Sequence, residues 1–371
     1  MTNSTRPQTE LFRRTFERIL LIKPSSLGDV VHALPVLHGL RRRYPDARID
    51  WLISSSLAPL LEGHPDLSEL ILFDRRRYGR MAYNPKAAAD LVRFIGRLRA
   101  RRYDLAIDLQ GLFRTGFLSW AAAPVRIGPA DAREGASVFY NHRMPPHDPD
   151  THAVDRNYSV ARLLGFADVP VEFHIPLSED DRAGAEGLLQ KGWHGPRSRG
   201  HVGRHGQRLV AVVPGARWET KIWLPERFAE AIDELQEGDD VRCVLLGGPD
   251  ETARCSQIAS ACKKAPIDLS GHTTLRTMTG VLAQADAVLC HDSGAMHLAV
   301  ALGRPVVCLV GPTNPARTGP YRRPGDVVRL DLDCAPCYLR KLSQCRFDHR
   351  CMRDLTVTPI VDAARRSLQL K

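Results

Sequence analysis

"RILLIKPSSLGDVVHALP", residues 18–35, sets the fold of the first half of the chain. An apolar run of strand length ends at Lys23, small residues and Gly28 form a turn, and apolar residues at helical spacing follow. This order of strand, turn and helix is typical of the opening of a βαβ unit. One carboxylate, Asp29, stands where the buried strand gives way to the helix.

The same order recurs along both halves of the chain. The strand-like runs are RIDWLI (48–53), ELILF (69–73), DLAIDL (104–109), RLVAVVP (208–214), RCVLLGG (242–248), ADAVLCHD (285–292) and RPVVCLVGP (304–312). Two segments, 141–155 and 194–207, have the composition of loops, and they separate the strand-like runs of the first half from those of the second half. The alternation predicts an α/β protein with two Rossmann-like domains, whose parallel sheets face each other across a cleft.

Charge and composition narrow the class of protein. The net charge of +10 comes from arginines clumped at 41–43, 75–77, 97–102 and 322–323, which suit phosphate-bearing partners or, equally, solvated helix faces. A nucleic-acid partner is not expected, because recognition motifs and aromatic platforms are missing from the sequence. No apolar run reaches the roughly 18 residues of a membrane span. The N-terminus lacks the apolar stretch of a secretory signal, so we expect a cytoplasmic protein.

Asp29 has two interpretations. A carboxylate in the first turn of a helix satisfies backbone N–H groups and complements the helix dipole, and taken alone this interpretation is favoured. The neighbouring Ser25, Ser26 and Gly28, however, let a ligand approach the backbone closely. The stretch is not the GxGxxG fingerprint of dinucleotide binding.

Two further segments carry polar groups directly after strands. In VVPGARWETKIWLPERF (212–228), Lys221 follows a glycine-containing turn and suits a phosphate, although a solvated lysine is an equal alternative. In CHDSGAMHLAVALGRPVVCLVGPTNP (290–315), a strand ends at Asp292, and Ser293, Gly294 and His297 open the next helix. The four residues predict one anion-sized site. Helix capping would explain Asp292 but not the Ser-Gly step or His297.

These segments resemble the bacterial heptosyltransferases of glycosyltransferase family 9, which build the inner core of lipopolysaccharide. The resemblance runs from about Ile19 to about Leu370 and includes YDLAIDLQGLFRTG (103–116) and LSGHTTL (269–275). It implies the GT-B fold. The domains it implies are a basic extension (1–17), an acceptor-side domain (18–190), a nucleotide-sugar domain (208–355) and a C-terminal helix crossing back towards the first domain (356–371).

The resemblance also implies a mechanism and a donor. Asp29 matches the general base of an inverting, direct displacement that needs no catalytic metal or other cofactor. Lys221 and the helix start at Ser293 and Gly294 would balance the charge of the departing diphosphate. The donor is expected to be ADP-heptose. The implied donor-binding set is Ser26, Gly28, Lys221, Asp292, Ser293, Gly294 and His297.

The acceptor side is also implied by the resemblance. Arg75, Arg76, Arg77, Arg133 and His152 match positions that face the acidic Kdo sugar and phosphates of the acceptor, and arginine pairs well with carboxylates. The acceptor would be a lipid-linked saccharide, with heptose added to Kdo or to the first heptose. Such an enzyme would work at the inner face of the inner membrane, where the N-terminal segment and helix 85–102 suit anionic headgroups.

Four cysteines in the tail are not explained by this chemistry. A structural zinc site also has four ligands, but the spacing of Cys334, Cys337, Cys345 and Cys351 is looser than in usual zinc sites. The favoured alternative is that these cysteines are reduced and serve in packing. Two other functions stay open. One is a nucleotide-sugar 2-epimerase on a similar fold, and the other is a non-catalytic protein that binds anionic membranes.

Overall fold

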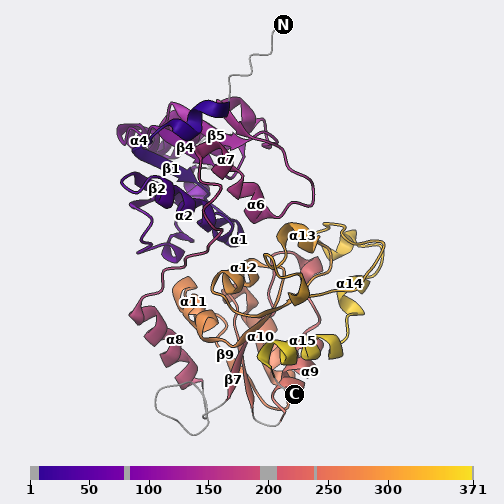
Figure 1. Ribbon diagram of the computed structural model, residues 1–371. Helices are drawn as coiled ribbons and strands as arrows, with labels where there is room; N and C mark the ends of the chain where they lie inside the picture. Colours follow the sequence, from indigo (N-terminus) through magenta and orange to yellow (C-terminus); the bar gives the residue numbers. More distant parts are fainter. Residues whose placement is uncertain (1–7, 79–83, 193–206, 238–239, 370–371) are drawn as a thin grey trace. The chain divides into compact units, whose positions relative to one another are not determined.

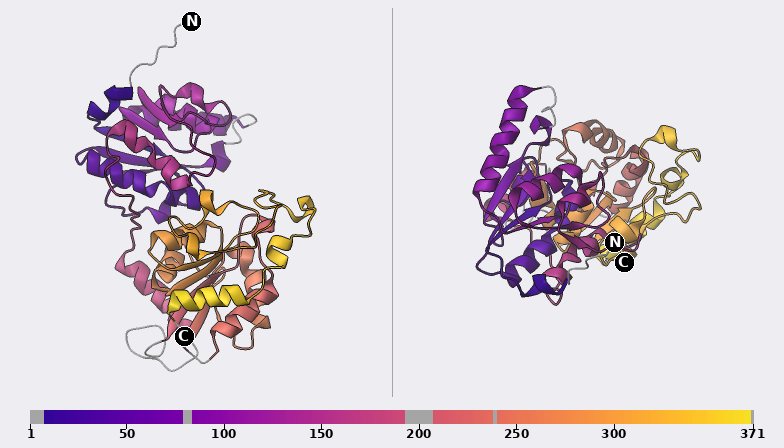
Figure 2. Two further views of the ribbon diagram at one scale, coloured as in Figure 1. Left: turned by 45° about the vertical axis from the view of Figure 1, so that its right-hand side comes forward. Right: turned by 90° about the horizontal axis from the view of Figure 1, so that it is seen from above.

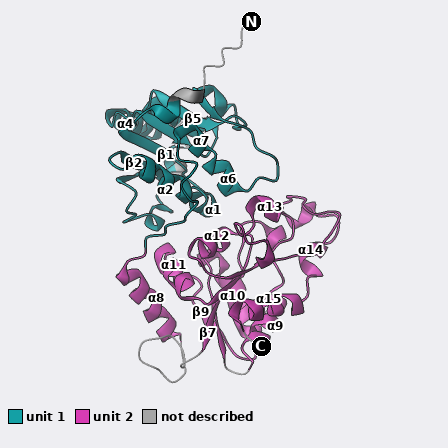
Figure 3. Ribbon diagram, viewed as in Figure 1, with its two compact units in different colours: residues 1–176 teal, residues 177–371 magenta. Residues whose placement is uncertain are grey.

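The computed structural model describes residues 8–78, 84–192, 207–237 and 240–369 (Figure 1). The chain divides into two compact units, residues 1–176 and 177–371 (Figure 3). Each unit has its own sheet and its own core, and each is described by itself below.

The described residues of unit 1 form a parallel sheet of six strands in the order β3-β2-β1-β4-β5-β6. The strands are β1 (Arg18–Ile22), β2 (Arg48–Ser54), β3 (Glu69–Phe73), β4 (Leu105–Asp108), β5 (Val125–Pro129) and β6 (His142–Met144). β1 lies between β2 and β4, and four of its five residues are buried. A parallel strand covered on both faces needs such a continuous apolar run.

Helices connect the strands of unit 1. They are α1 (Leu27–Val31), α2 (Leu34–Arg43), α3 (Arg75–Tyr78), α4 (Pro85–Ala100), α5 (Phe113–Ala122), α6 (Ala153–Tyr158) and α7 (Val160–Leu164), with the 3-10 turns η1 (Gln8–Arg13), η2 (Ala58–Leu60) and η3 (Ala136–Phe139). α4 begins at Pro85, and the Asn84 side chain accepts a hydrogen bond from the backbone N–H of Ala87. Phe94 of α4 packs on Phe73 and Tyr78 and joins α4 to the sheet.

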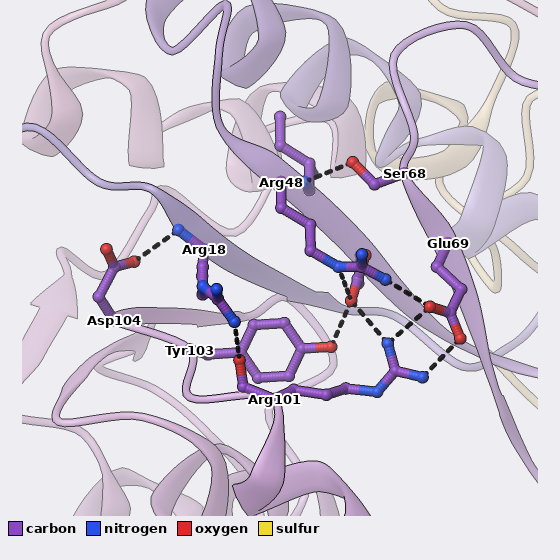
Figure 4. A network of polar contacts seen from close by, with 9 residues as sticks. Arg18, Arg48, Ser68, Glu69, Arg101, Tyr103 and Asp104 are labelled. Carbon is purple, nitrogen blue, oxygen red and sulfur yellow. Dashed lines mark hydrogen bonds and ion pairs between the residues drawn. The ribbon is translucent and has the colours of Figure 1, made fainter.

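A polar network closes the amino-terminal edge of this sheet (Figure 4). The buried carboxylate of Asp50 accepts hydrogen bonds from Tyr103 (2.6 Å), Arg48 (3.1 Å) and Arg101 (3.1 Å). Glu69 pairs with both arginines. Arg101, which belongs to one of the arginine clumps in the sequence, therefore ties the end of α4 to β2 and β3.

Removing this buried carboxylate tests the network. In Asp50→Ala, two arginines and a buried phenol lose their shared acceptor, so we expect the free energy of unfolding to fall by about 3–5 kcal/mol. Urea unfolding measures it. Arg93→Ala, which removes an exposed partner of Asp90, should cost about 1 kcal/mol or less. Equal losses in the two variants would contradict a structural role for Asp50.

The described residues of unit 2 form a second parallel sheet of six strands in the order β12-β11-β10-β7-β8-β9. The strands are β7 (Arg208–Val213), β8 (Val241–Leu245), β9 (Ile267–Asp268), β10 (Ala287–His291), β11 (Val306–Leu309) and β12 (Val327–Val328). Counted from its own first strand, this is the strand order of unit 1. The two Rossmann-like sheets expected from the alternating pattern are confirmed.

The helices of unit 2 are α8 (Glu179–Lys191), α9 (Pro225–Leu235), α10 (Thr252–Ala261), α11 (Leu275–Gln284), α12 (Gly294–Ala301), α13 (Pro315–Thr318), α14 (Arg350–Arg353) and α15 (Thr358–Leu368). The 3-10 turns are η4 (Glu219–Lys221), η5 (Pro249–Glu251), η6 (Pro324–Asp326) and η7 (Leu342–Gln344). Trp223 and Phe228 are fully buried in the core, with their rings 5.0 Å apart and edge to face.

Two helices of unit 2 bear on the expected domain bounds, which stay a prediction. α8 lies inside the expected first domain (18–190), yet it packs on α11 of unit 2, and the Asp181 carboxylate pairs with Arg276. α15 lies against α9 and the strands β10, β11 and β12 of unit 2 (Figures 1 and 2). Its residues Ile360, Val361 and Ala364 are buried in the core of that unit, and the expected crossing of 356–371 towards the first domain stays a prediction. Both helices bury their apolar faces on unit 2.

Candidate functional site

Asp29 stands at the carboxyl end of β1, in the first turn of α1. Its Oδ2 accepts hydrogen bonds from the backbone N–H (2.9 Å) and the hydroxyl (2.7 Å) of Ser26, and Gly28 is buried beside it. The carboxylate therefore does cap the helix, as one interpretation held. Its side chain is nevertheless 42% exposed, so the cap leaves it accessible to a ligand.

Lys23 lies next to Asp29, the charge of Asp108 also acts on Lys23, and both residues were missed as site residues. The Lys23 ammonium donates to the carbonyl oxygen of Leu109 (2.6 Å) and lies 3.9 Å from Asp29 Oδ1. Burial lowers the pKa of Lys23, while the charges of Asp29 and Asp108 act against this shift. Asp108 accepts hydrogen bonds from Tyr140 and from the N–H groups of Gln110 and Gly111, and burial raises its pKa.

Two of the expected acceptor residues lie near this group. The N–H of Arg133 donates to Gly111, and its guanidinium, like that of Arg156, adds a smaller lowering to the pKa of Lys23. The His152 ring packs edge to face on His32, which ends α1, at 5.5 Å. Arg156 was missed, and it also pairs with Asp131.

The arginines of α3 are a separate group. α3 follows β3, the outermost strand of the sheet, two strands from β1. Arg77 is 52% exposed and pairs with Asp90 of α4, so its charge already has a partner. The side chains of Arg75 and Arg76 lie outside the described residues.

In unit 2, Asp292 is the centre of the polar group. It follows β10 and is 4% exposed. Lys221 donates to both its carbonyl oxygen and its Oδ2 at 2.8 Å, and the hydroxyls of Thr313 (2.7 Å) and Thr318 (3.2 Å) donate to the same Oδ2. His297 Nε2 lies 3.9 Å from Oδ1. The structure thus brings together Lys221, Asp292 and His297 as expected and adds the two threonines.

The electrostatics keep Asp292 ionised. Burial opposes its charge, but the charges of Lys221 and His297 and the hydrogen bonds of Lys221 and Thr313 outweigh burial and lower the pKa of Asp292. Two of the three N–H groups of Lys221 are used on Asp292, which leaves one for a ligand oxygen. Lys221 also lies 4.8 Å from the Trp218 ring, and Arg340 lies 5.0 Å from the same ring.

The helix that starts after Asp292 offers the other polar groups. Ser293 is the N-cap of α12, and its hydroxyl oxygen is buried without a hydrogen-bond partner among the described residues. The first N–H groups of a helix have no partner within the helix and attract anions. Ser293 and Gly294 therefore fit an anionic ligand such as a phosphate.

His291, one residue before Asp292, holds the Lys221 segment in place. Its Nε2 accepts the backbone N–H of Trp223 at 2.9 Å, and its ring packs on Phe228. The Trp223 indole is buried and donates to Leu355. Because Lys221 and Trp223 are anchored on consecutive residues of one strand end, the separation of Lys221 and Asp292 is fixed by the core.

The four tail cysteines gather beside this segment. Burial and the nearby Cys334, Cys337 and Cys345 raise the pKa of Cys351 to about 11. The loop that carries them binds η4, with His349 bonded to the carbonyl of Thr220 at 2.8 Å. No group of three or more potential metal ligands has suitable geometry in the part of the chain that the structure describes. Reduced packing cysteines stay the favoured interpretation, and a structural zinc site stays the alternative.

Buried neutral His291 predicts a pH dependence. Burial lowers its pKa from 6.5 to about 3. Between these values the unfolded chain holds more protons, so the free energy of unfolding falls with falling pH by up to about 1.4 kcal/mol per unit. His291→Gln does not titrate, and its stability should fall less steeply when denaturant unfolding is measured from about pH 7 to about pH 4. Parallel pH curves for the two proteins would contradict a neutral buried His291.

Known proteins are similar to this chain in sequence. The family model for glycosyltransferase family 9 (heptosyltransferase) matches residues 91–347. Lipopolysaccharide heptosyltransferase 1 of Pseudomonas aeruginosa is 31% identical over 335 residues, which cover 86% of each chain.

Solved structures agree with the sequence comparison. The ADP-heptose lipopolysaccharide heptosyltransferase II of Escherichia coli superposes with a TM-score of 0.71 at 23% identity, covering 95% of this chain and 98% of that one. Escherichia coli heptosyltransferase WaaC with ADP-2-deoxy-2-fluoro heptose gives a TM-score of 0.65 at 26% identity, covering 95% and 99%. The expected GT-B fold is confirmed.

Proposed function

The chain belongs to glycosyltransferase family 9, the heptosyltransferases, and from this premise we propose that it transfers a heptose from ADP-heptose to the inner core of lipopolysaccharide. The acceptor is Kdo or the first heptose of a lipid-linked saccharide. The protein then works at the cytoplasmic face of the inner membrane. In the described residues, no helix combines the length and the apolar character needed to cross a membrane.

The proposed reaction is a direct displacement with inversion. An acceptor hydroxyl attacks C1 of the heptose and forms the new C–O bond. The bond from C1 to the diphosphate breaks, and its electron pair leaves with ADP. The hydroxyl proton passes to Asp29, whose exposed carboxylate is held by Ser26. This observation carries the proposal, because a base must combine fixed orientation with access to substrate.

The diphosphate is assigned to unit 2. Lys221 is already paired with Asp292, so that pair has no net charge to offer a ligand. The N–H groups at Ser293 and Gly294, the remaining N–H of Lys221 and the nearby Arg340 are therefore proposed to stabilise the departing charge. No metal ion is needed in this scheme. His297 and Asp292 are proposed to position the donor.

The acidic acceptor is assigned to the cations around Asp29. Arg133 and Arg156 lie near the buried Lys23, and guanidinium groups suit the carboxylate of Kdo. His152 belongs to the same group through its packing on His32. Arg75 and Arg76 stay proposed acceptor residues. Arg77 would have to exchange Asp90 for the acceptor.

Single-turnover transfer from ADP-heptose to Kdo-lipid A, and to its once-heptosylated product, tests the proposal. Asp29→Asn should lower the rate by roughly 10²- to 10⁴-fold, because the acceptor proton loses its base. Asp181→Asn is a control for the loss of a helix cap, since Asp181 caps α8 through the same two contacts, from the N–H (2.9 Å) and hydroxyl (2.6 Å) of Ser178. Asp181 also pairs with Arg276, so the unfolding midpoint of this variant is measured as well.

The outcomes separate the competing functions. A rate that falls equally in both variants would mean that Asp29 only caps its helix. Interconversion of free ADP-heptose without acceptor would favour the epimerase. Binding of ADP-heptose with no turnover on either acceptor would contradict the proposed transfer to the inner core.

A further inference from the structure

The outer face of α5 carries a row of aromatic residues that is partly exposed. Phe113, Phe117 and Trp120 are spaced i, i+4 and i+7 and so share one face of the helix. Leu118 and Ala122 lie on the opposite face and are buried against the sheet. Phe113 is 51% exposed and Trp120 is 49% exposed.

The turn η3 extends this row. The Phe139 ring packs edge to face on Phe113 at 5.1 Å and on Phe117 at 6.1 Å. Its neighbour Val138 is 73% exposed. We call Phe113, Phe117, Trp120, Val138 and Phe139 the α5–η3 surface. The two elements approach each other closely at Gly116, where an added Cβ would lie 2.9 Å from the Phe139 ring.

Cations border the α5–η3 surface. The Arg99 guanidinium of α4 lies over the Trp120 ring at 5.9 Å, and Arg114 is exposed on α5. One acid is also present, because Glu134 accepts the backbone N–H of Phe113. Exposed tryptophan and phenylalanine beside arginines are typical of proteins that lie in the interface of an anionic bilayer.

The α5–η3 surface adjoins the group around Asp29. Phe113 opens α5 five residues after β4, whose last residue, Asp108, pairs in register with Ile22 of β1. The Gly111 carbonyl before the helix accepts the N–H of Arg133, one of the proposed acceptor residues. A lipid-linked acceptor at this edge would therefore have its lipid next to the aromatic row.

We propose that the α5–η3 surface inserts into the headgroup region of an anionic bilayer and so presents the lipid-linked acceptor to Asp29. The inference rests on the proposed function, because only that function requires an acceptor embedded in a membrane. A second copy of the chain is a poorer occupant. The three exposed side chains offer on the order of 300 Å², whereas a stable interface needs roughly 800 Å² per partner.

This assignment differs from the expected role of helix 85–102. Arg101 forms ion pairs with Asp50 and Glu69, and Arg93 forms an ion pair with Asp90. The arginines of this helix are thus partly structural. Arg99, however, stands beside Trp120 and borders the α5–η3 surface.

Vesicle flotation of the full-length protein tests the proposal. The wild type should bind phosphatidylcholine vesicles that contain phosphatidylglycerol, and added salt should weaken binding. The double variant Trp120→Ser/Val138→Ser should bind at least about tenfold more weakly, because both side chains lose apolar burial. Phe347→Ser is the matched control, since Phe347 is 53% exposed and lies under Arg350 but belongs to unit 2.

Equal binding by the wild type and the double variant would overturn the proposal, as would failure of the wild type to bind. If the wild type were dimeric and the double variant monomeric, while both bound lipid equally, the surface would be assigned to a second copy of the chain instead. Both changed positions are exposed, so unfolding midpoints should confirm that the variant folds.

Two readouts connect the surface to the lipid and to catalysis. Lipids with brominated acyl chains should quench wild-type tryptophan emission more than that of Trp120→Phe, and equal quenching would contradict insertion. The double variant should keep wild-type transfer to a deacylated, soluble acceptor and lose transfer to the acylated form of that acceptor in vesicles. If neither protein transfers heptose, the proposed function fails, while the flotation result still decides the membrane surface.

Discussion

The buried carboxylate of Asp292 holds together the loops that carry the polar residues of the candidate site in unit 2. It joins three loops, since it follows β10 and binds Lys221 after β7 and Thr313 and Thr318 after β11. An ionised group with 4% exposure is stable only when such partners surround it. The strand order makes this possible, because β7, β10 and β11 are adjacent and parallel, and their carboxyl ends meet at one edge.

Asp29 also follows a central strand, in the sheet of unit 1, but it has the opposite exposure. Both aspartates stand where a central strand gives way to a helix, but Asp29 is 42% exposed and Asp292 is buried. A buried, fully bonded carboxylate positions its neighbours, whereas an exposed one held on one side can accept a proton. This contrast is the physical basis for assigning the base to unit 1 and the donor's charge to unit 2.

The sequence supported the fold and the two aspartates because each depends on local patterns. Apolar runs before glycine-containing turns located β1 and β10, and the polar residues after them followed from the geometry of parallel sheets. Lys23 and Arg156 were missed because their surroundings come from residues far along the chain, such as Leu109. The partner of Arg77 and the packing of α8 on α11 were hidden for the same reason.

Equilibrium binding of ADP to two variants tests the division of roles most directly. Lys221→Met should bind ADP about ten- to a hundredfold more weakly than wild type, since a charged hydrogen bond to the diphosphate is lost. Asp29→Asn should bind ADP like the wild type, because its role concerns the acceptor proton alone. Normal binding in Lys221→Met, or an equal loss in both variants, would contradict the account.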